Sequence, residues 1–278
     1  MSRQRPPAPA GLSARGATLS YGRTPVVEDV DLDLPIGGLT VIVGPNGCGK
    51  STLLKAFARV LKPVRGAITL DGKDVHGYRG REFARTVALL PQSPIAPEGV
   101  SVRDLVRRGR HPHHTLLRQW SPDDDHAIGF ALDRTGLGDL ADTPAGDLSG
   151  GQRQRAWIAM VLAQETPIVL LDEPTTFLDI AHQYELLELC AELNDEGRTV
   201  AAVLHDLDQA ARFASHLVVV KAGRVVAQGT PHEVLTAARV LDVFGLACDI
   251  VPDPLTGTPK VIPHTRRAGT TTGPANGA

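Results

Sequence analysis

The sequence predicts an α/β fold with a mostly parallel core sheet, an antiparallel β subdomain and a helical insert. Short, continuous apolar segments rich in β-branched residues, such as Leu39–Val43 and Ile168–Leu171, are typical of buried strands. Helical patterns alternate with these strands, as in a sheet whose parallel strands are joined by helices. Residues 101–163 carry no strand pattern, so we expect them to form the mostly helical insert.

The composition is that of an ordinary globular chain. The 278 residues include 29 Lys and Arg against 31 Asp and Glu, which gives a formal net charge of −2. Hydrophobic residues make up 42%, which excludes a disordered chain. The near-neutral charge argues against a protein that acts mainly by binding nucleic acid. No run approaches the roughly 18 apolar residues of a membrane span, so a stable membrane link would need a partner.

The cysteines and the first residues indicate a compartment. Cys48, Cys190 and Cys248 are odd in number and scattered, which suits a reducing environment and suggests no disulfide framework. The first ten residues contain two arginines but no apolar segment, so they do not resemble a secretory signal. We therefore expect a cytoplasmic location.

The ends of the chain differ in composition from its middle. Residues 1–11 are rich in Pro and Ala and are predicted to be a disordered tail. The main domain is expected over residues 12–247, with its helical subdomain at about 93–160. Residues 248–278 are interpreted as a C-terminal extension, disordered after about residue 264 because little there can be buried.

The elements of the main domain are predicted from apolar periodicity and turn residues. Thr18–Tyr21 and Val26–Leu34 alternate apolar and polar residues, which favours antiparallel strands. Beyond Leu39–Val43, the expected elements are a helix from about Lys50 to Val60, strands Ala67–Leu70 and Val87–Leu90, the insert, strand Ile168–Leu171, helix Ile180–Asn194, strand Val200–Leu204, a hairpin of Leu217–Val220 with Val225–Ala227, and short helices.

A glycine-rich segment between a predicted strand and a predicted helix has the pattern of a phosphate-binding loop. Its residues are Gly44, Pro45, Asn46, Gly47, Cys48, Gly49, Lys50, Ser51 and Thr52. Glycines let successive backbone N–H groups curl around anionic oxygens, and the helix N-terminus adds unpaired donors and a favourable dipole. Lys50 supplies a cation for the outer phosphates, and the Ser51 hydroxyl is a ligand for Mg²⁺.

Cys48 lies inside this loop and has two interpretations. A helix N-terminus lowers the pKa of a thiol, which would make Cys48 reactive. The simpler interpretation is a small residue tolerated in a variable position, and the sequence alone favours it.

Two adjacent acids follow the predicted strand Ile168–Leu171. Asp172 would lie at the carboxyl edge of the sheet, where α/β proteins build their sites, and would hold Mg²⁺ directly or through water. Glu173 is then placed to polarise the water that attacks the terminal phosphate. The alternative is a strand end with two solvated acids, which the phosphate-binding loop in the same chain makes less favourable.

A third motif precedes an apolar-periodic helix that runs through Leu162. Ser149 is a natural N-cap, and Gly150 and Gly151 leave the start of the helix open to a phosphate. Alone, this pattern is equally typical of an ordinary serine-capped helix. Because Leu148–Gln152 lies after the phosphate loop and before Asp172, its interpretation as a phosphate-binding helix start becomes more specific.

With these three motifs in this order, the sequence resembles the ATP-binding subunit of an ABC transporter, a P-loop NTPase, over residues 12–250. The resemblance implies roles for four further residues. Tyr21 would stack on adenine, Gln92 would sense Mg²⁺ and nucleotide, Asp179 would communicate across a dimer, and His205 would lie near the terminal phosphate. Glu173, His205, Lys50 and Gln92 would then be catalytic, and Ser51, Gln92 and Asp172 would hold Mg²⁺.

The resemblance also implies partners. Two copies would face each other head to tail, with ATP between the loop of one copy and Ser149, Gly150, Gly151 and Gln152 of the other. The pair would dock on two integral-membrane permease subunits at the cytoplasmic face of the membrane. An extracytoplasmic substrate-binding protein would act through the permease, and no nucleic acid is expected.

Finer features resemble the iron–siderophore and related metal-chelate importers: residues 107–114, Leu117–Ser121, Val203–Ala210 and Val251–Pro259. That group usually has Asn where Asp208 stands. His111, His113 and His114 suggest a metal site, but no carboxylate or Cys pattern accompanies them, so an exposed basic segment is favoured.

Other functions are weighed against this one. The cargo could instead be haem, cobalamin or another metal chelate. A soluble ABC ATPase of DNA maintenance would carry long heptad arms before Ser149, and a translation factor usually carries two cassettes; neither is present. A module that binds nucleotide without hydrolysis would lack the acid at Glu173.

Overall fold

The computed structural model describes residues 11–94, 98–114 and 120–264, so nearly all of the two predicted disordered tails lies outside it. Its strands are β1 Leu12–Ser20, β2 Pro25–Leu34, β3 Leu39–Val43, β4 Arg65–Leu70, β5 Lys73–Asp74, β6 Val87–Leu90, β7 Ile168–Asp172, β8 Thr199–Val203, β9 His216–Lys221, β10 Arg224–Gly229, β11 Cys248–Pro252 and β12 Pro259–Pro263. Its α-helices are α1 Lys50–Phe57, α2 Gly80–Ala84, α3 Val102–Arg107, α4 Pro122–Arg134, α5 Gly150–Ala163, α6 Ile180–Asp195, α7 Leu207–Phe213, α8 Pro231–Val234 and α9 Ala237–Phe244.

The core sheet is mostly parallel, as predicted. Its strand order is β10-β9-β3-β8-β7-β6, and the pairs from β9 to β6 are parallel, while β10 is antiparallel to β9. The carboxyl ends of β3, β6, β7 and β8 therefore meet at one edge of the sheet. Asp172 ends β7, and Gly44, Gln92 and His205 lie in the segments that follow β3, β6 and β8, so the topology gathers these predicted site residues there.

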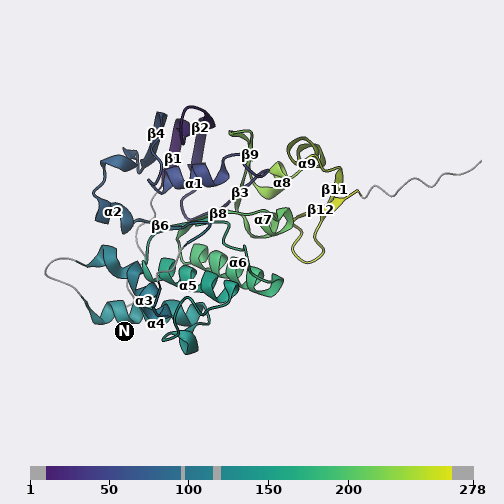
Figure 1. The fold of residues 1–278 in the computed structure, drawn as a ribbon. Coiled ribbons are helices and arrows are strands. Elements are labelled where there is room, and N and C mark those ends of the chain that lie inside the picture. The colour runs from purple at the N-terminus through teal and green to yellow at the C-terminus, as the bar shows by residue number, and fades with distance from the viewer. Residues whose placement is uncertain (1–10, 95–97, 115–119, 265–278) are drawn as a thin grey trace, which may run out of the picture.

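A separate antiparallel sheet, in the order β2-β1-β4-β5, forms the second layer. Helix α1 lies between this sheet and the core sheet (Figure 1). The core strands are buried on both faces and alternate their side chains between them. Ile42 and Leu170 pack toward α1, and Val41 and Leu171 pack toward the helices on the opposite face.

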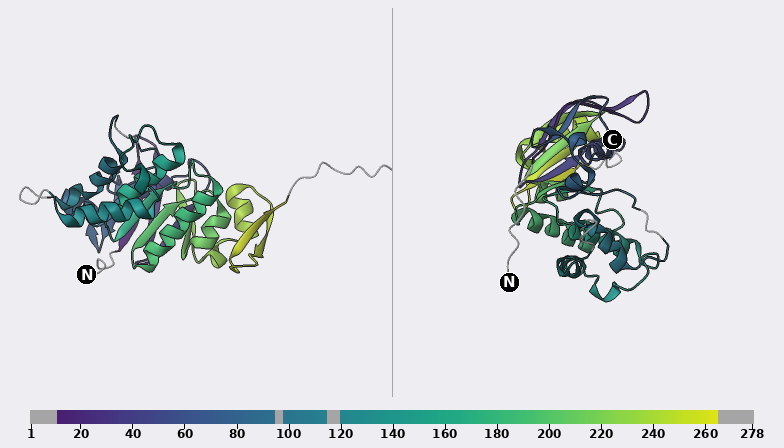
Figure 2. Two further views of the ribbon diagram at one scale, coloured as in Figure 1. Left: turned by 90° about the horizontal axis from the view of Figure 1, so that it is seen from below. Right: turned by 90° about the vertical axis from the view of Figure 1, so that its left-hand side faces the viewer.

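The helical insert packs beneath the core sheet, with α3 and α4 against α5 (Figures 1 and 2). It holds a buried ion pair: Arg110 Nε donates to Asp124 Oδ1 at 2.7 Å, and both side chains are about 95% buried. A further nitrogen of Arg110 donates to Ala163 O and to Glu165. These charge-assisted bonds tie the insert to the end of α5.

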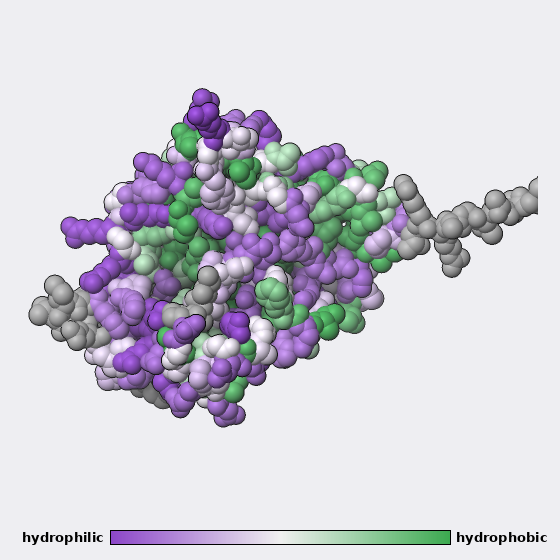
Figure 3. Space-filling model, in the orientation of Figure 1, coloured by the Kyte–Doolittle hydropathy of each residue, from purple (hydrophilic) through white to green (hydrophobic). Residues whose placement is uncertain are grey.

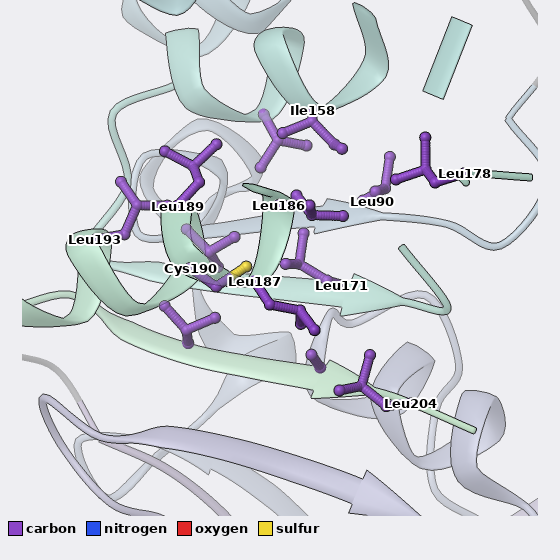
Figure 4. Packing of buried hydrophobic residues seen from close by; sticks show 14 of the residues in the cluster. Leu90, Ile158, Leu171, Leu178, Leu186, Leu187, Leu189, Cys190, Leu193 and Leu204 are labelled. Carbon is purple, nitrogen blue, oxygen red and sulfur yellow. The ribbon is translucent and has the colours of Figure 1, made fainter. Parts of the chain in front are cut away.

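Helix α6 carries the apolar face that covers the core sheet. Leu186, Leu187, Cys190 and Leu193 recur at helical spacing, and Figure 4 shows them directed toward β7, β8 and α5. The loop residue Leu178 belongs to the same cluster. The packing fixes the position of the loop that precedes α6, which carries Asp179.

The C-terminal hairpin of β11 and β12 was not predicted by the strand patterns. It packs on α7 and α9, and apolar surface gathers over this part of the molecule (Figure 3). The Val261 N–H donates to Asp208 Oδ1 at 2.8 Å. This bond needs only a side-chain oxygen, which both Asp and Asn carry. An Asp in place of Asn at this position therefore keeps the bond.

Strand β5 and helices α2 and α7 were also not predicted, and the other differences from the predictions are at element ends. Strand β1 begins at Leu12, well before Thr18, and ends before Tyr21. Helix α1 ends at Phe57 because Arg59 adopts a φ of +61°, which a helix cannot contain. Within the described ranges, no helix is long and apolar enough to cross a membrane.

Candidate ATP site

The loop between β3 and α1 has the conformation that a phosphate cradle requires. Gly44, Gly47 and Gly49 have φ values of +154°, +74° and +105°. A Cβ on Gly44 would lie 2.1 Å from Val220 O, and one on Gly49 would lie 2.7 Å from Val27 Cγ2. Glycine is therefore required at both positions, by backbone conformation and by close packing.

The loop leaves its donors free for an anion. Gly49 is the N-cap of α1 and has no side chain to occupy the first N–H groups of the helix. Lys50 is 95% buried, and its Nζ donates to Gly44 O at 2.8 Å and Pro45 O at 3.0 Å. The ammonium group is thus held across the loop, where it would meet a bound phosphate.

Ser51 and Asp172 are brought together from positions far apart in the sequence. Ser51 Oγ donates to Asp172 Oδ1 at 2.7 Å, and Asp172 is 99% buried at the end of β7. Burial raises the pKa of the Asp172 carboxyl, while the hydrogen bond from Ser51 acts in the opposite direction. Asp172 Oδ2 is buried without a hydrogen-bond partner among the described residues. A hydroxyl and a free carboxylate oxygen are a donor set that suits Mg²⁺.

Glu173 is held from two sides. Gln92 Nε2 donates to Glu173 Oε2 at 2.8 Å, and His205 Nε2 lies 2.8 Å from Glu173 Oε1. The backbone of Glu173 has a φ of +53°, a strained conformation for a residue with a side chain. The side chain is only 13% exposed. The structure thus joins three predicted site residues around one carboxylate.

Tyr21 lies just before β2 and its side chain is 62% exposed. The start of β2 also packs on the loop, because Val26 O and Val27 Cγ2 are the atoms that approach Gly49. Tyr21 is thus an exposed aromatic residue, and its stacking on adenine stays a prediction.

The third motif, Leu148–Gln152, here called the signature segment, forms a capped helix start, as predicted. Ser149 Oγ accepts from the Gln152 N–H at 3.2 Å, and Gln152 Oε1 accepts from the Ser149 N–H at 3.0 Å. This reciprocal capping box pairs the N–H groups of Ser149 and Gln152, while no described side chain caps the N–H groups of Gly150 and Gly151. Among the described residues, no hydrogen bond or ion pair joins this segment to Lys50, Asp172 or Glu173.

The signature segment instead lies against the loop before α6. A Cβ on Gly150 would lie 3.6 Å from Phe177 Cβ, and one on Gly151 would lie 3.4 Å from Leu178 Cδ2. Asp179 caps α6: its Oδ1 accepts from the His182 N–H at 3.0 Å and lies 2.7 Å from His182 Nδ1. The bond from the His182 N–H holds the pKa of Asp179 below its usual range.

The sequence patterns did not single out several residues of this loop. Phe177 and Ile180 flank Asp179 and are 77% and 73% exposed, which is unusual for large apolar side chains. Gln183 and Gln209 hydrogen-bond to each other behind the loop. Gln209 precedes two buried alanines in α7, and a polar residue in that setting is the signal that could have found it.

The structure shows the surroundings of two further features of the sequence, Cys48 and the histidines of residues 111–114. Cys48 is buried, and burial raises the pKa of its thiol, which favours the unreactive interpretation. His113 lies 2.8 Å from Gln164 O, and burial lowers its pKa. Within the described ranges, no group of three or more His, Cys, Asp or Glu side chains is arranged to hold a metal ion.

Comparison with known proteins assigns the family. The sequence model of the family described as "ABC transporter" matches residues 27–176 of this chain. The chain belongs to the ABC transporter family. It is therefore an ATPase of this family, and the predicted α/β fold with its antiparallel sheet is the fold of ABC ATPases.

Curated members of the family match almost the whole chain. The ferric enterobactin transport ATP-binding protein of Escherichia coli strain K12 is 51% identical over 94% of this chain and 97% of its own length. A probable siderophore transport system ATP-binding protein of Bacillus subtilis strain 168 is 50% identical over 92% of this chain and 94% of its own.

Solved structures of ABC proteins share the fold. A metal-chelate type ABC transporter in an inward-facing conformation matches with a TM-score of 0.78 and 27% identity, over 92% of this chain and 98% of that one. A dimeric bacterial ABC transporter cassette matches with a TM-score of 0.72 and 26% identity, over 79% of this chain and 98% of that one.

Proposed function

We propose that this ABC ATPase powers the import of ferric siderophores through a membrane permease. Hydrolysis is supported by one arrangement above all: Glu173 is held by Gln92 and His205 directly after the buried, partly unpartnered Asp172. The cargo class is supported by relatives named for ferric enterobactin and siderophore transport at about 50% identity. A relative named for cobalamin import is 40% identical, which makes another metal chelate the second candidate.

The residues of the loop bind and orient ATP. The N–H groups of the glycine loop and of the first turn of α1 face the phosphates, and Lys50 moves its ammonium from the loop carbonyls to the outer phosphate oxygens. Ser51, Asp172 and Gln92 would hold Mg²⁺, which neutralises charge on the phosphates when bound. Tyr21 stacks on the adenine.

Glu173 accepts hydrogen bonds from the attacking water and orients it toward the terminal phosphate. Gln92 and His205 keep its carboxylate in one orientation, so the water meets a preorganised acceptor. Because Gln92 and His205 are also the residues expected near Mg²⁺ and the terminal phosphate, their bonds to Glu173 would change when nucleotide binds and leaves.

The complete site requires a second copy of the chain. Among the described residues, the segment Leu148–Gln152 makes no hydrogen bond to the phosphate loop of its own chain. The N–H groups of Gly150 and Gly151, which no side chain caps, suit the terminal phosphate held by a partner. In this arrangement ATP links the two copies and hydrolysis removes the link. Asp179 and its exposed apolar neighbours then lie at the contact.

The dimer docks on two permease subunits at the cytoplasmic face of the membrane and works with an extracytoplasmic substrate-binding protein. The test is ATP hydrolysis by the purified chain with and without reconstituted permease, together with uptake of iron-55 bound to a siderophore. We expect permease to increase hydrolysis, and a Glu173→Gln variant to abolish uptake. A rate of ATP hydrolysis that does not change when permease is added would contradict the transport function. Uptake of cobalamin but not of iron would select the second candidate.

A further inference from the structure

The loop between β7 and α6 is held in place by a glutamine behind it. Gln183 Nε2 donates to Leu178 O at 3.0 Å and, more weakly, to Thr175 O at 3.4 Å. These carbonyls belong to the two ends of the turn Thr175–Leu178, which directly precedes Asp179. One amide group therefore clamps both ends of that turn from within α6.

The clamp is itself oriented from another helix. Gln209 Nε2 in α7 donates to Gln183 Oε1 at 2.8 Å, and Gln209 is 96% buried. Carbonyl oxygens can only accept, so the Gln183 amide must turn its NH₂ group to the loop and its oxygen to Gln209. The two amides thus have one mutually consistent orientation, which a rotation of either would break.

Gln209 connects this pair to the segment after His205, the residue expected to lie near the terminal phosphate. Its backbone N–H donates to Asp206 Oδ1 at 2.8 Å, which caps α7 directly after His205. The backbone of Gln209 therefore bonds the cap of α7, next to His205. Its side chain bonds Gln183, which holds the loop before Asp179. The path crosses between α6 and α7 through a single hydrogen bond.

We propose that Gln183 and Gln209 are positioning residues that link the His205 end of α7 to the Asp179 loop, so that the two segments move as one body. The inference rests on the proposed roles of His205 at the phosphate and Asp179 at the dimer contact. A shift of His205 when the terminal phosphate leaves is then carried to the surface that faces the second copy. The link acts on turnover, because neither glutamine touches the cradle that binds ATP.

The test is a mutant cycle on the full-length chain. Gln183→Leu removes both ends of the clamp, and Gln209→Leu removes the donor that orients it. Gln183→Glu is the sharper variant: it keeps an oxygen for Gln209 but loses the donor to the loop. Gln164→Leu is the matched control, because Gln164 also donates to backbone carbonyls, those of Ala84 and Val87, at the far end of α5.

We expect Gln183→Leu and Gln183→Glu to lower kcat roughly tenfold while the KM for ATP changes less than about twofold, since ATP binding is spared. The control should lose a similar amount of thermal stability yet keep its kcat. Because the glutamines form one link, the double variant Gln183→Leu with Gln209→Leu should be no slower than the slower single variant.

Two results would overturn the inference: unchanged kcat in both Gln183 variants, or losses that multiply in the double variant. Parallel assays of Glu173→Gln and His205→Ala separate this failure from that of the proposed function. If those two variants hydrolyse ATP normally, the proposed roles at the site are wrong. If they are inactive while the glutamine variants are normal, only the link is wrong.

Discussion

Gln92 and His205 bind opposite oxygens of the Glu173 carboxylate, at 2.8 Å each, although they follow different strands of the core sheet. A carboxylate held at both oxygens has a fixed plane, and its backbone is strained at a φ of +53°. The Glu173 carboxylate is thus already oriented before a water binds, as expected for a preorganised hydrolytic site.

Replacing Glu173 by Gln is expected to preserve ATP binding and to reduce turnover by about 10²-fold or more, because the amide has the same shape but cannot act as a base. Steady-state phosphate release measures this. The variant should also accumulate as an ATP-bound dimer in size-exclusion chromatography. Hydrolysis at the original rate would refute the assigned role.

Replacing Lys50 by Ala should weaken ATP binding by roughly 10- to 100-fold, the usual contribution of a hydrogen bond to a charged group. Binding of a fluorescent ATP analogue measures the change. Lys62→Ala is the control, because Lys62 is exposed and outside the loop. Equal affinity for ATP in the two variants would contradict the assigned role of Lys50 in phosphate binding.

Replacing Ser149 by Arg should prevent ATP-driven dimerisation and leave ATP binding to the single chain unchanged. The arginine would fill the surface through which a partner's phosphate must approach. Ser101→Arg is the matched control, because Ser101 also caps a helix, α3, with a bond to the Asp104 N–H. Small-angle scattering with ATP, on both variants in the Glu173→Gln background, measures whether dimers form. Dimers of the Ser149→Arg variant would disprove the contact between Ser149 of one copy and the ATP of the other.

Replacing Asp124 by Ala should cost about 2–3 kcal/mol of stability at pH 7, because Arg110 loses its buried carboxylate partner and keeps only Glu165 and Ala163 O. The exposed pair of Arg103 and Asp142 supplies the control, and Asp142→Ala should cost less than about 1 kcal/mol. Urea denaturation of the three proteins measures both values.

The effect of Asp124 should depend on pH. Burial by itself would raise the pKa of Asp124, but the hydrogen bonds from Arg110 and Ser121 outweigh it and hold the pKa below the ordinary 3.8. The stabilisation is therefore complete above the ordinary pKa and is lost as pH falls through the lowered one. The stability gap between the wild type and Asp124→Ala should shrink only below about pH 4; a gap that closes near pH 6 would point to a histidine instead.

Local patterns were enough to predict the motifs and most strands. The phosphate loop depends on glycines within one turn, and Ser149 caps its own helix, so each could be found from neighbouring residues. The element ends were less predictable. Arg59 ends α1 by adopting a left-handed conformation that no sequence rule requires. The β11 and β12 hairpin was missed because its stability comes from α7 and α9.

The sequence by itself therefore determined the fold class, the family and the chemical character of the ATP site, because those depend on residue types at short spacings. Only the tertiary structure decided that Ser51 bonds Asp172, that Gln92 and His205 contact Glu173, and that Gln209 of α7 bonds Gln183 of α6. Each of these contacts joins segments distant in the chain, and their meeting depends on the strand order of the sheet, which no local pattern encodes.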